Sequence, residues 1–135
     1  MLKNFKELET QILWHQIEHV ERLDSGEISA ELQIPPESQW FSGHFPGQPI
    51  LPGIAQLALV RDIISQACGG PVAISEFNRV KFKKMITPGK FLRIMATPKQ
   101  GPDDAYTFRI LVENEVVCSG NFTLRIDGKN RDQIQ

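Results

Sequence analysis

Polar and apolar side chains alternate near the start of the chain, and this pattern predicts a pair of strands. Apolar residues occupy every second position of one segment, namely Ile28, Ala30, Leu32 and Ile34. A period of two is typical of a strand that buries one face. The preceding segment, 12–23, is rich in strand-forming residues, and turn-forming residues at 24–26 separate the two segments. We therefore expect a hairpin here, which should end at Pro35 and Pro36.

The second half of the chain predicts further strands. Strand-forming residues fill 74–86 and 91–97, and a Thr-Pro-Gly sequence between them predicts a turn. Segments 106–113 and 116–126 predict a closing hairpin around Asn114. One face of its second strand should carry Val116, Cys118, Gly120, Phe122, Leu124 and Ile126.

The most apolar segment, 52–68, has the spacing of a largely buried helix. Pro52 suits a first helical position, and Gly69-Gly70 should end the helix. The apolar arc of the helical wheel holds Leu57, Leu59, Val60, Ile63, Ile64 and Ala67. The opposite side holds Ile54, Ala58, Arg61, Asp62 and Ser65. Gln56 interrupts the apolar arc, and the sequence offers no reason for it.

One long helix with about six mostly antiparallel strands predicts an α+β domain, in which a curved sheet wraps around the helix. A length of 135 residues fits a single domain, 1–135, with a hydrophobic core of its own. The formal net charge of −1 does not favour a nucleic-acid partner. No apolar run is long enough to span a membrane.

The sequence shows no secretory signal, no Cys/His cluster for a metal and no motif for a cofactor. The two cysteines, Cys68 and Cys118, follow no disulfide spacing, so we expect both to be reduced and buried in a cytoplasmic protein. These observations leave a soluble enzyme or binding protein that uses ordinary side chains.

A single histidine, His44, opens a stiff segment directly before the predicted helix. Prolines fix the backbone of this segment and glycines permit close approach by a ligand; they are Pro46, Pro49, Pro52, Gly43, Gly47 and Gly53. A rigid loop that holds an imidazole beside a helix start favours a functional site over a linker. Imidazole is also the side chain best suited to acid–base chemistry near neutral pH.

The string GHFPGQPILPG in this segment resembles the signature of the 3-hydroxyacyl-acyl-carrier-protein dehydratases of fatty-acid synthesis, which have the hot-dog fold. The resemblance extends to ILWHQIEHVERLDSGEISAELQIPPESQWF, RVKFKKMITPGKFLRI and VENEVVCSGNFTL. It implies a lyase that converts 3-hydroxyacyl thioesters into trans-2-enoyl thioesters, with no metal or other cofactor. It also implies homodimers with sheets joined edge to edge, and it leaves larger assemblies of such dimers open.

The resemblance assigns roles to residues of this chain. It implies that His44 is the catalytic base and that the Gly53 amide holds the thioester carbonyl. The family places Glu or Asp fourteen residues after the histidine, where this chain has Ala58. Asp62, one turn further along the helix, is our candidate for the missing acid. An ion pair between Asp62 and Arg61 is the alternative reading. Arg61 itself could bind substrate, and further candidate substrate contacts are Phe45, Pro52, Ile54 and Ala58.

The segment from Arg79 to Lys99 contains basic residues and no acidic ones. An acidic acyl carrier protein would suit such a surface, with the candidate patch formed by Arg79, Lys81, Lys83 and Lys84. A solvated strand face whose lysines discourage edge pairing is an equal alternative.

The dehydration could serve fatty-acid synthesis or a specialised lipid or polyene pathway. Two other functions are alternatives to it. One is an acyl-thioesterase, in which Asp62 or Gln56 positions a water. The other is a non-catalytic acyl-binding paralogue, which the Ala58 departure favours.

Overall fold

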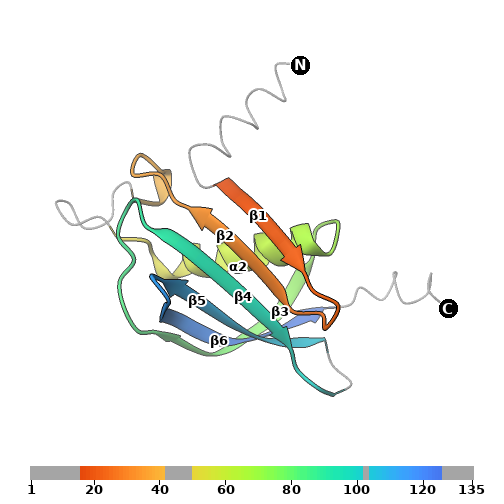
Figure 1. Cartoon of the computed structure of the whole chain (residues 1–135). Helices are drawn as coiled ribbons and strands as arrows, with labels where there is room; N and C mark the ends of the chain where they lie inside the picture. The colour runs from red at the N-terminus through yellow and green to blue at the C-terminus, as the bar shows by residue number, and fades with distance from the viewer. Residues whose placement is uncertain (1–15, 42–49, 102–103, 126–135) are drawn as a thin grey trace.

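The computed structural model describes residues 16–41, 50–101 and 104–125, and in this part of the chain an antiparallel sheet covers one long helix (Figure 1). The sheet has six strands in the order β1-β2-β4-β5-β6-β3. Helix α2 spans Gly53–Ala67 and lies against one face of the sheet. The expected α+β architecture is therefore confirmed. The strand bounds are β1 Gln16–Arg22, β2 Ile28–Gln33, β3 Ala73–Phe82, β4 Phe91–Pro98, β5 Ala105–Val112 and β6 Glu115–Arg125.

The predicted N-terminal hairpin is confirmed by the antiparallel pairing of β1 with β2. The four alternating apolar residues of the second segment, Ile28, Ala30, Leu32 and Ile34, are each 1% exposed or less. Strand β4 pairs with the other edge of β2, so this buried row lies between two neighbours of the sheet. A short 3-10 helix, Gln39–Phe41, follows the hairpin, and residues 42–49 lie outside the described part of the chain.

The predicted helix is confirmed, with Pro52 at its N-cap and Cys68 at its C-cap. Its buried residues are Ala55, Gln56, Leu59, Val60, Ile63 and Ile64. Four of these belong to the expected apolar arc, whereas Leu57 and Ala67 are only partly buried. The buried side of the helix is therefore rotated slightly from the expected arc, towards Ala55, and Gln56 lies inside the core.

Strand β3 ends earlier than its sequence predicts, at Phe82 instead of residue 86. After Phe82 the chain leaves the regular ladder, because the amides of Lys83 and Lys84 both donate to the Val117 carbonyl. Ile86 then accepts a hydrogen bond from the Leu51 amide, at 2.8 Å, and lies beside the segment that leads into the helix. The early end of the strand thus places the residues after Phe82 next to the start of α2.

The closing hairpin forms as predicted, with Glu113 and Asn114 at its turn. Both residues have positive φ, 53° and 66°, which is the geometry of a tight two-residue hairpin turn. The pairing of β5 with β6 shifts register between Ile110 and Leu111, and this interrupts the alternation of inward and outward side chains in the facing part of β6. As a result Val117 and Cys118 are both buried, whereas alternation alone assigns neighbours to opposite faces.

Gly120 in β6 lies against the aromatic core without room for a side chain. A Cβ atom at this position would lie 2.9 Å from Phe108 Cε2 and 3.1 Å from the Cα of Val80. Phe108 is fully buried and its ring packs against Phe77 at a centroid distance of 6.0 Å in an edge-on geometry. Neither the ring nor the backbone has room to retreat, so only glycine fits here.

We expect Gly120→Ala to lower the free energy of unfolding by about 1–3 kcal/mol, because the added methyl overpacks a closed site. Urea denaturation followed by tryptophan fluorescence measures this loss. Gly70→Ala is the matched control, since nothing lies within 4 Å of its Cβ position. A Gly120→Ala midpoint equal to that of Gly70→Ala would contradict the packing argument.

The two cysteines have different surroundings. Both are free thiols, but Cys118 is buried in β6 and Cys68 is exposed. The expectation that both are buried is therefore wrong for Cys68, because it lies at the C-cap, beyond the apolar arc of the helix. Burial raises the pKa of the Cys118 thiol to about 11, since the thiolate would lose its hydration.

A thiol reagent such as dithionitrobenzoate should therefore modify Cys68 quickly in the native protein and Cys118 only after denaturation. The unfolded Cys118 ionises at lower pH than the folded one, near its ordinary value of 9.0. The free energy of unfolding should consequently fall as pH rises from about 9 to about 11. Cys68→Ser should abolish the fast phase, and two fast thiols in the native wild type would refute the assignment.

Candidate functional site

The first turn of α2 presents backbone amides that have no acceptor on the helix. Pro52 is the N-cap and makes no side-chain capping hydrogen bond. Its carbonyl accepts from the Ala55 and Gln56 amides, at 3.1 and 3.2 Å. Within the described residues no hydrogen bond uses the amides of Gly53 or Ile54. Unpaired amides at a helix start, aided by the helix dipole, favour a ligand oxygen that carries negative charge.

Gly53 is held against a ring from strand β3. A Cβ at Gly53 would lie 2.9 Å from Phe82 Cζ. The absence of a side chain therefore lets Phe82 cover this first turn. Phe82 is nevertheless 51% exposed. Two other large apolar residues at this end of the helix and after β3 are also exposed, Ile54 at 74% and Met85 at 73%. The start of the helix and the end of β3 thus form an exposed apolar surface, which we call the Phe82 surface.

Gln56 has a structural role that the sequence did not suggest. It is 3% exposed, and its Nε2 donates to the Leu51 carbonyl at 3.3 Å. The Leu51 amide donates to Ile86. Both backbone groups of Leu51 are therefore bound, one to the segment after β3 and the other to the helix itself.

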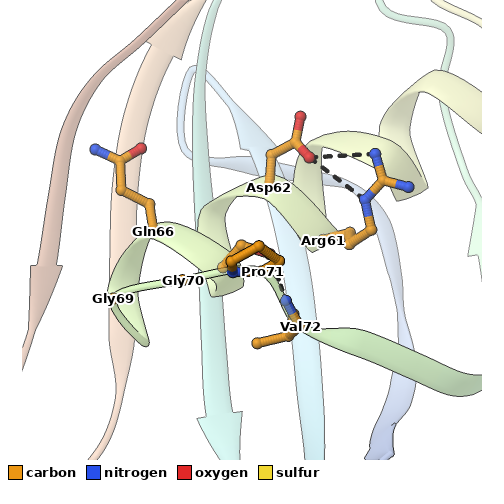
Figure 2. Close-up of a pocket in the computed structure, with 8 residues that line it drawn as sticks. Arg61, Asp62, Gln66, Gly69, Gly70, Pro71 and Val72 are labelled. Carbon is orange, nitrogen blue, oxygen red and sulfur yellow. Dashed lines mark hydrogen bonds and ion pairs between the residues drawn. The ribbon is translucent and has the colours of Figure 1, made fainter.

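Asp62 and Arg61 lie on the outward side of α2, as the helical wheel predicts. Figure 2 shows the guanidinium of Arg61 turned towards Asp62 Oδ1, with Nη2 at 3.3 Å and Nε at 3.4 Å. Their side chains are 55% and 34% exposed. The expected alternative for Asp62, an ion pair with Arg61, is thus present in the structure. Such a half-exposed pair contributes little to stability.

The same two residues line an open pocket of about 750 Å³ at the C-terminal half of the helix (Figure 2). The rest of its lining comes from the last turn of α2 and the connection to β3: Ser65, Gln66, Gly69, Gly70, Pro71 and Val72. Ser65 Oγ accepts from the Val72 amide at 3.1 Å, which fixes that connection against the helix. Asp62 is therefore accessible to a small molecule that enters from this side.

The predicted site residues are only partly brought together. His44 and Phe45 lie outside the described residues, so their position relative to the helix stays a prediction. Gly53 and Asp62 share one helix, nine residues apart, which corresponds to about 13 Å along its axis. A side chain at Ala58 would be about 7 Å from Gly53 by the same measure. Asp62 is therefore one turn further from the helix start than the acid of the resembled family.

The predicted basic patch is exposed but partly neutralised. Lys84 Nζ lies 2.6 Å from Glu115 Oε2, an acid that the β5–β6 hairpin places beside it. Beyond the patch, ion pairs also join Lys90 to Glu113 and Arg93 to Glu31. In the described ranges, Arg79, Lys81 and Lys83 have no acidic partner within ion-pair distance. Sequence reasoning did not identify Glu115 and Glu113 as partners of basic residues, because both acids lie some thirty positions downstream of the patch. Their place at the predicted Asn114 turn is the one sequence signal that they could lie near the lysines.

Within the described part of the chain, strand β3 is an edge strand that pairs with β6 alone. This position is what the alternative reading of the lysines requires, because exposed positive charge on an edge discourages unwanted pairing. The patch and the edge are therefore the same surface, and they adjoin the Phe82 surface. Among the described residues no helix is long and apolar enough to span a membrane, and no cluster of side chains there suits a metal ion.

Comparison with known proteins gives a consistent result. The family model ApeI-like, described as ApeI dehydratase, matches residues 19–121. A 3-hydroxyacyl-[acyl-carrier-protein] dehydratase FabZ from Lactobacillus helveticus is 28% identical over 117 residues, which cover 79% of each chain. The FabZ of Rickettsia felis is 31% identical over 100 residues, covering 67% of this chain and 69% of that protein.

A solved structure, the dehydratase heterocomplex ApeI:P from Xenorhabdus doucetiae, superposes with a TM-score of 0.73 at 28% identity. The match covers 83% of this chain and 98% of that one. The expected hot-dog fold is confirmed by this superposition and by the sheet-and-helix arrangement described above. With more than half of its length matched by the family model, the chain belongs to the ApeI-like dehydratase family.

Proposed function

We propose that this protein dehydrates 3-hydroxyacyl thioesters, delivered on acyl carrier protein, to trans-2-enoyl thioesters. The observation that carries the proposal is the pair of amides at Gly53 and Ile54, at the start of α2, for which the described residues supply no acceptor. Removal of a proton next to a thioester carbonyl develops negative charge on that oxygen, and such amides stabilise it. Membership of a dehydratase family and the FabZ relatives support the same reaction.

In the proposed reaction His44 removes a proton from C2 of the acyl chain. The Gly53 amide donates to the carbonyl oxygen while the enolate forms. The C3–O bond then breaks, the C2–C3 double bond forms, and Asp62 protonates the departing hydroxyl, which leaves as water. Phe45, Pro52, Ile54 and Ala58 would line the acyl chain in this arrangement.

Asp62 would have to act as the acid while it is paired with Arg61. The Arg61 guanidinium occupies one of its oxygens, so a substrate hydroxyl would compete with Arg61 for the carboxyl group. The alternative is that Arg61 itself contacts the substrate. The pocket beside both residues supports access of a ligand to either side chain.

A second candidate function is a non-catalytic acyl-binding subunit, and Ala58 is the specific observation that favours it. Alanine cannot transfer a proton, and Asp62 lies one helical turn further from Gly53. In this alternative the chain would keep the fold and the acyl site of the family without its acid. The thioesterase alternative differs by its product, a free thiol, which a thiol reagent detects.

We also propose two partners. A carrier protein would dock on Arg79, Lys81, Lys83 and Lys84 by charge complementarity, with Lys84 weakened in this role by Glu115. A second copy of the chain would cover the Phe82 surface, in a homodimer. The exposed apolar side chains there support this, because isolated domains rarely leave several large apolar residues exposed together. The acyl chains that the enzyme accepts would distinguish fatty-acid synthesis from a specialised lipid or polyene pathway.

The test of the reaction is the absorbance of the enoyl thioester formed from 3-hydroxyacyl carrier protein substrates of several chain lengths. We expect turnover in the wild type and a loss of about 10²–10⁴-fold in His44→Ala, because a general base is removed. Asp62→Asn should lower turnover to a similar extent if Asp62 is the acid.

Arg61→Gln is the companion variant: it keeps the carboxyl group of Asp62 and removes the ion pair together with any contact between Arg61 and the substrate. Wild-type activity in Asp62→Asn would exclude Asp62 as the acid. No turnover in the wild type, with retained binding of the acyl carrier protein, would overturn the dehydratase proposal in favour of the acyl-binding subunit. Release of a free thiol would favour the thioesterase.

Sedimentation equilibrium tests the homodimer, for which we expect twice the chain mass of 15.3 kDa. Phe82→Lys should shift the protein towards the monomer, because it places a charge in the covered apolar surface. Leu23→Lys is the control, since Leu23 is also exposed, at 43%, but lies in the connection between β1 and β2. A monomeric wild type, or equal behaviour of the two variants, would contradict the proposed interface.

A further inference from the structure

Gln56 is a polar residue in a place where an apolar one would cost less. It lies on the buried side of α2 with Leu59, Val60 and Ile63, each of which is fully buried. Its Nε2 has a partner, the Leu51 carbonyl, but its Oε1 is buried and accepts no hydrogen bond from any of the residues that the structure describes. A buried acceptor without a donor destabilises a fold, because it has lost its water without replacement. Methionine has a similar shape and would avoid this loss.

The hydrogen bond that Gln56 makes has an unusual position. The side chain of Gln56 holds the Leu51 carbonyl, and its backbone amide holds the next carbonyl along, that of Pro52, at 3.2 Å. The Leu51 amide is bound in turn to the Ile86 carbonyl at 2.8 Å. One helical residue thus fixes two consecutive peptide groups, and the segment after β3 fixes the peptide group directly before them.

Gly53 directly follows these two residues. The N–H of Gly53 belongs to the peptide group that begins with the Pro52 carbonyl, so its direction is set when that carbonyl is held. Pro52 itself has φ −62° and ψ 154°, an extended conformation that turns the chain into the helix. A clamp on the Leu51 and Pro52 carbonyls therefore controls where the Gly53 amide points.

We propose that Gln56 is a positioning residue, which aims the amide of Gly53 at the thioester oxygen. The inference rests on the proposed function, because it assigns that amide to the substrate. Gln56 does not touch the substrate in this role, since its side chain is enclosed in the core. Preorganised donors need such support, because a small misplacement of a donor loses much of its effect.

The test compares Gln56→Met with the wild type in two measurements. Amide hydrogen exchange by NMR should become at least about 10-fold faster at Leu51, Ala55 and Gln56, the amides of the clamp, because local opening costs less. The kcat for dehydration should fall about 10- to 100-fold with KM nearly unchanged. The urea midpoint should stay close to that of the wild type, because the variant removes one orphan acceptor, Oε1, and creates another at Leu51.

Leu59→Met is the matched control, since it makes the same kind of change on the same buried face and breaks no hydrogen bond. It should leave the exchange at the clamp and the kcat unaltered. A purely structural role for Gln56 would lower the urea midpoint and leave the kcat of the folded protein unchanged. Wild-type exchange and kcat in Gln56→Met would overturn the inference.

Gln56→Glu keeps the test decisive if the methionine variant does not fold. A protonated carboxyl group can donate to the Leu51 carbonyl and a carboxylate cannot, and burial favours the protonated form. The clamp should therefore be protected from exchange at low pH and lose its protection as the pH rises, unlike in the wild type. Absence of that pH dependence would overturn the inference. A wild type without turnover would refute the proposed function alone, because the exchange measurement still reports on the clamp.

Discussion

The burial of one side of helix α2 against the sheet is the interaction on which the rest of the structure depends. Leu59, Val60, Ile63 and Ile64 are fully enclosed, and the alternating apolar row of β2 packs into the same core. Removal of this much apolar surface from water is the main force that holds a domain of this size together. It also fixes the rotation of the helix, so that the opposite side, with Arg61 and Asp62, must face outwards.

A helix held in this way has a start and an end with different properties. The start lies beneath Phe82 and next to the end of β3, with two amides that no acceptor among the described residues binds. The other end opens into a pocket beside the Gly69-Gly70 connection. The chemistry proposed here needs the start, whereas the candidate acid lies near the pocket. Position 58 lies between the helix start and Asp62 along the axis. An acid at position 58 would be nearer to the Gly53 amide than Asp62 is, so its replacement by alanine changes the proposed chemistry.

Several polar features acquire meaning only when distant segments meet. Gln56 interrupts the apolar arc in the sequence, and the structure shows that it binds the carbonyl five residues before it. The segment from Arg79 to Lys99 contains basic residues and no acidic ones, yet the turn at Asn114 brings Glu115 to Lys84. Charge counted along a chain therefore overstates the charge of a surface when a neighbouring strand supplies the opposite sign.

The sequence by itself determined the helix, the two hairpins and the family, because periodicity, turn residues and the His44–Gly53 signature are local properties of the chain. It determined less well where strands end and where the alternation of buried and exposed side chains is interrupted. Strand β3 stops at Phe82, and Val117 is buried although its neighbour Cys118 is buried too. Tertiary structure alone decided the exposure of Cys68, the pairing of Asp62 with Arg61 and the burial of Gln56. These depend on the exact rotation of a packed helix and on contacts between remote segments, which no local pattern contains.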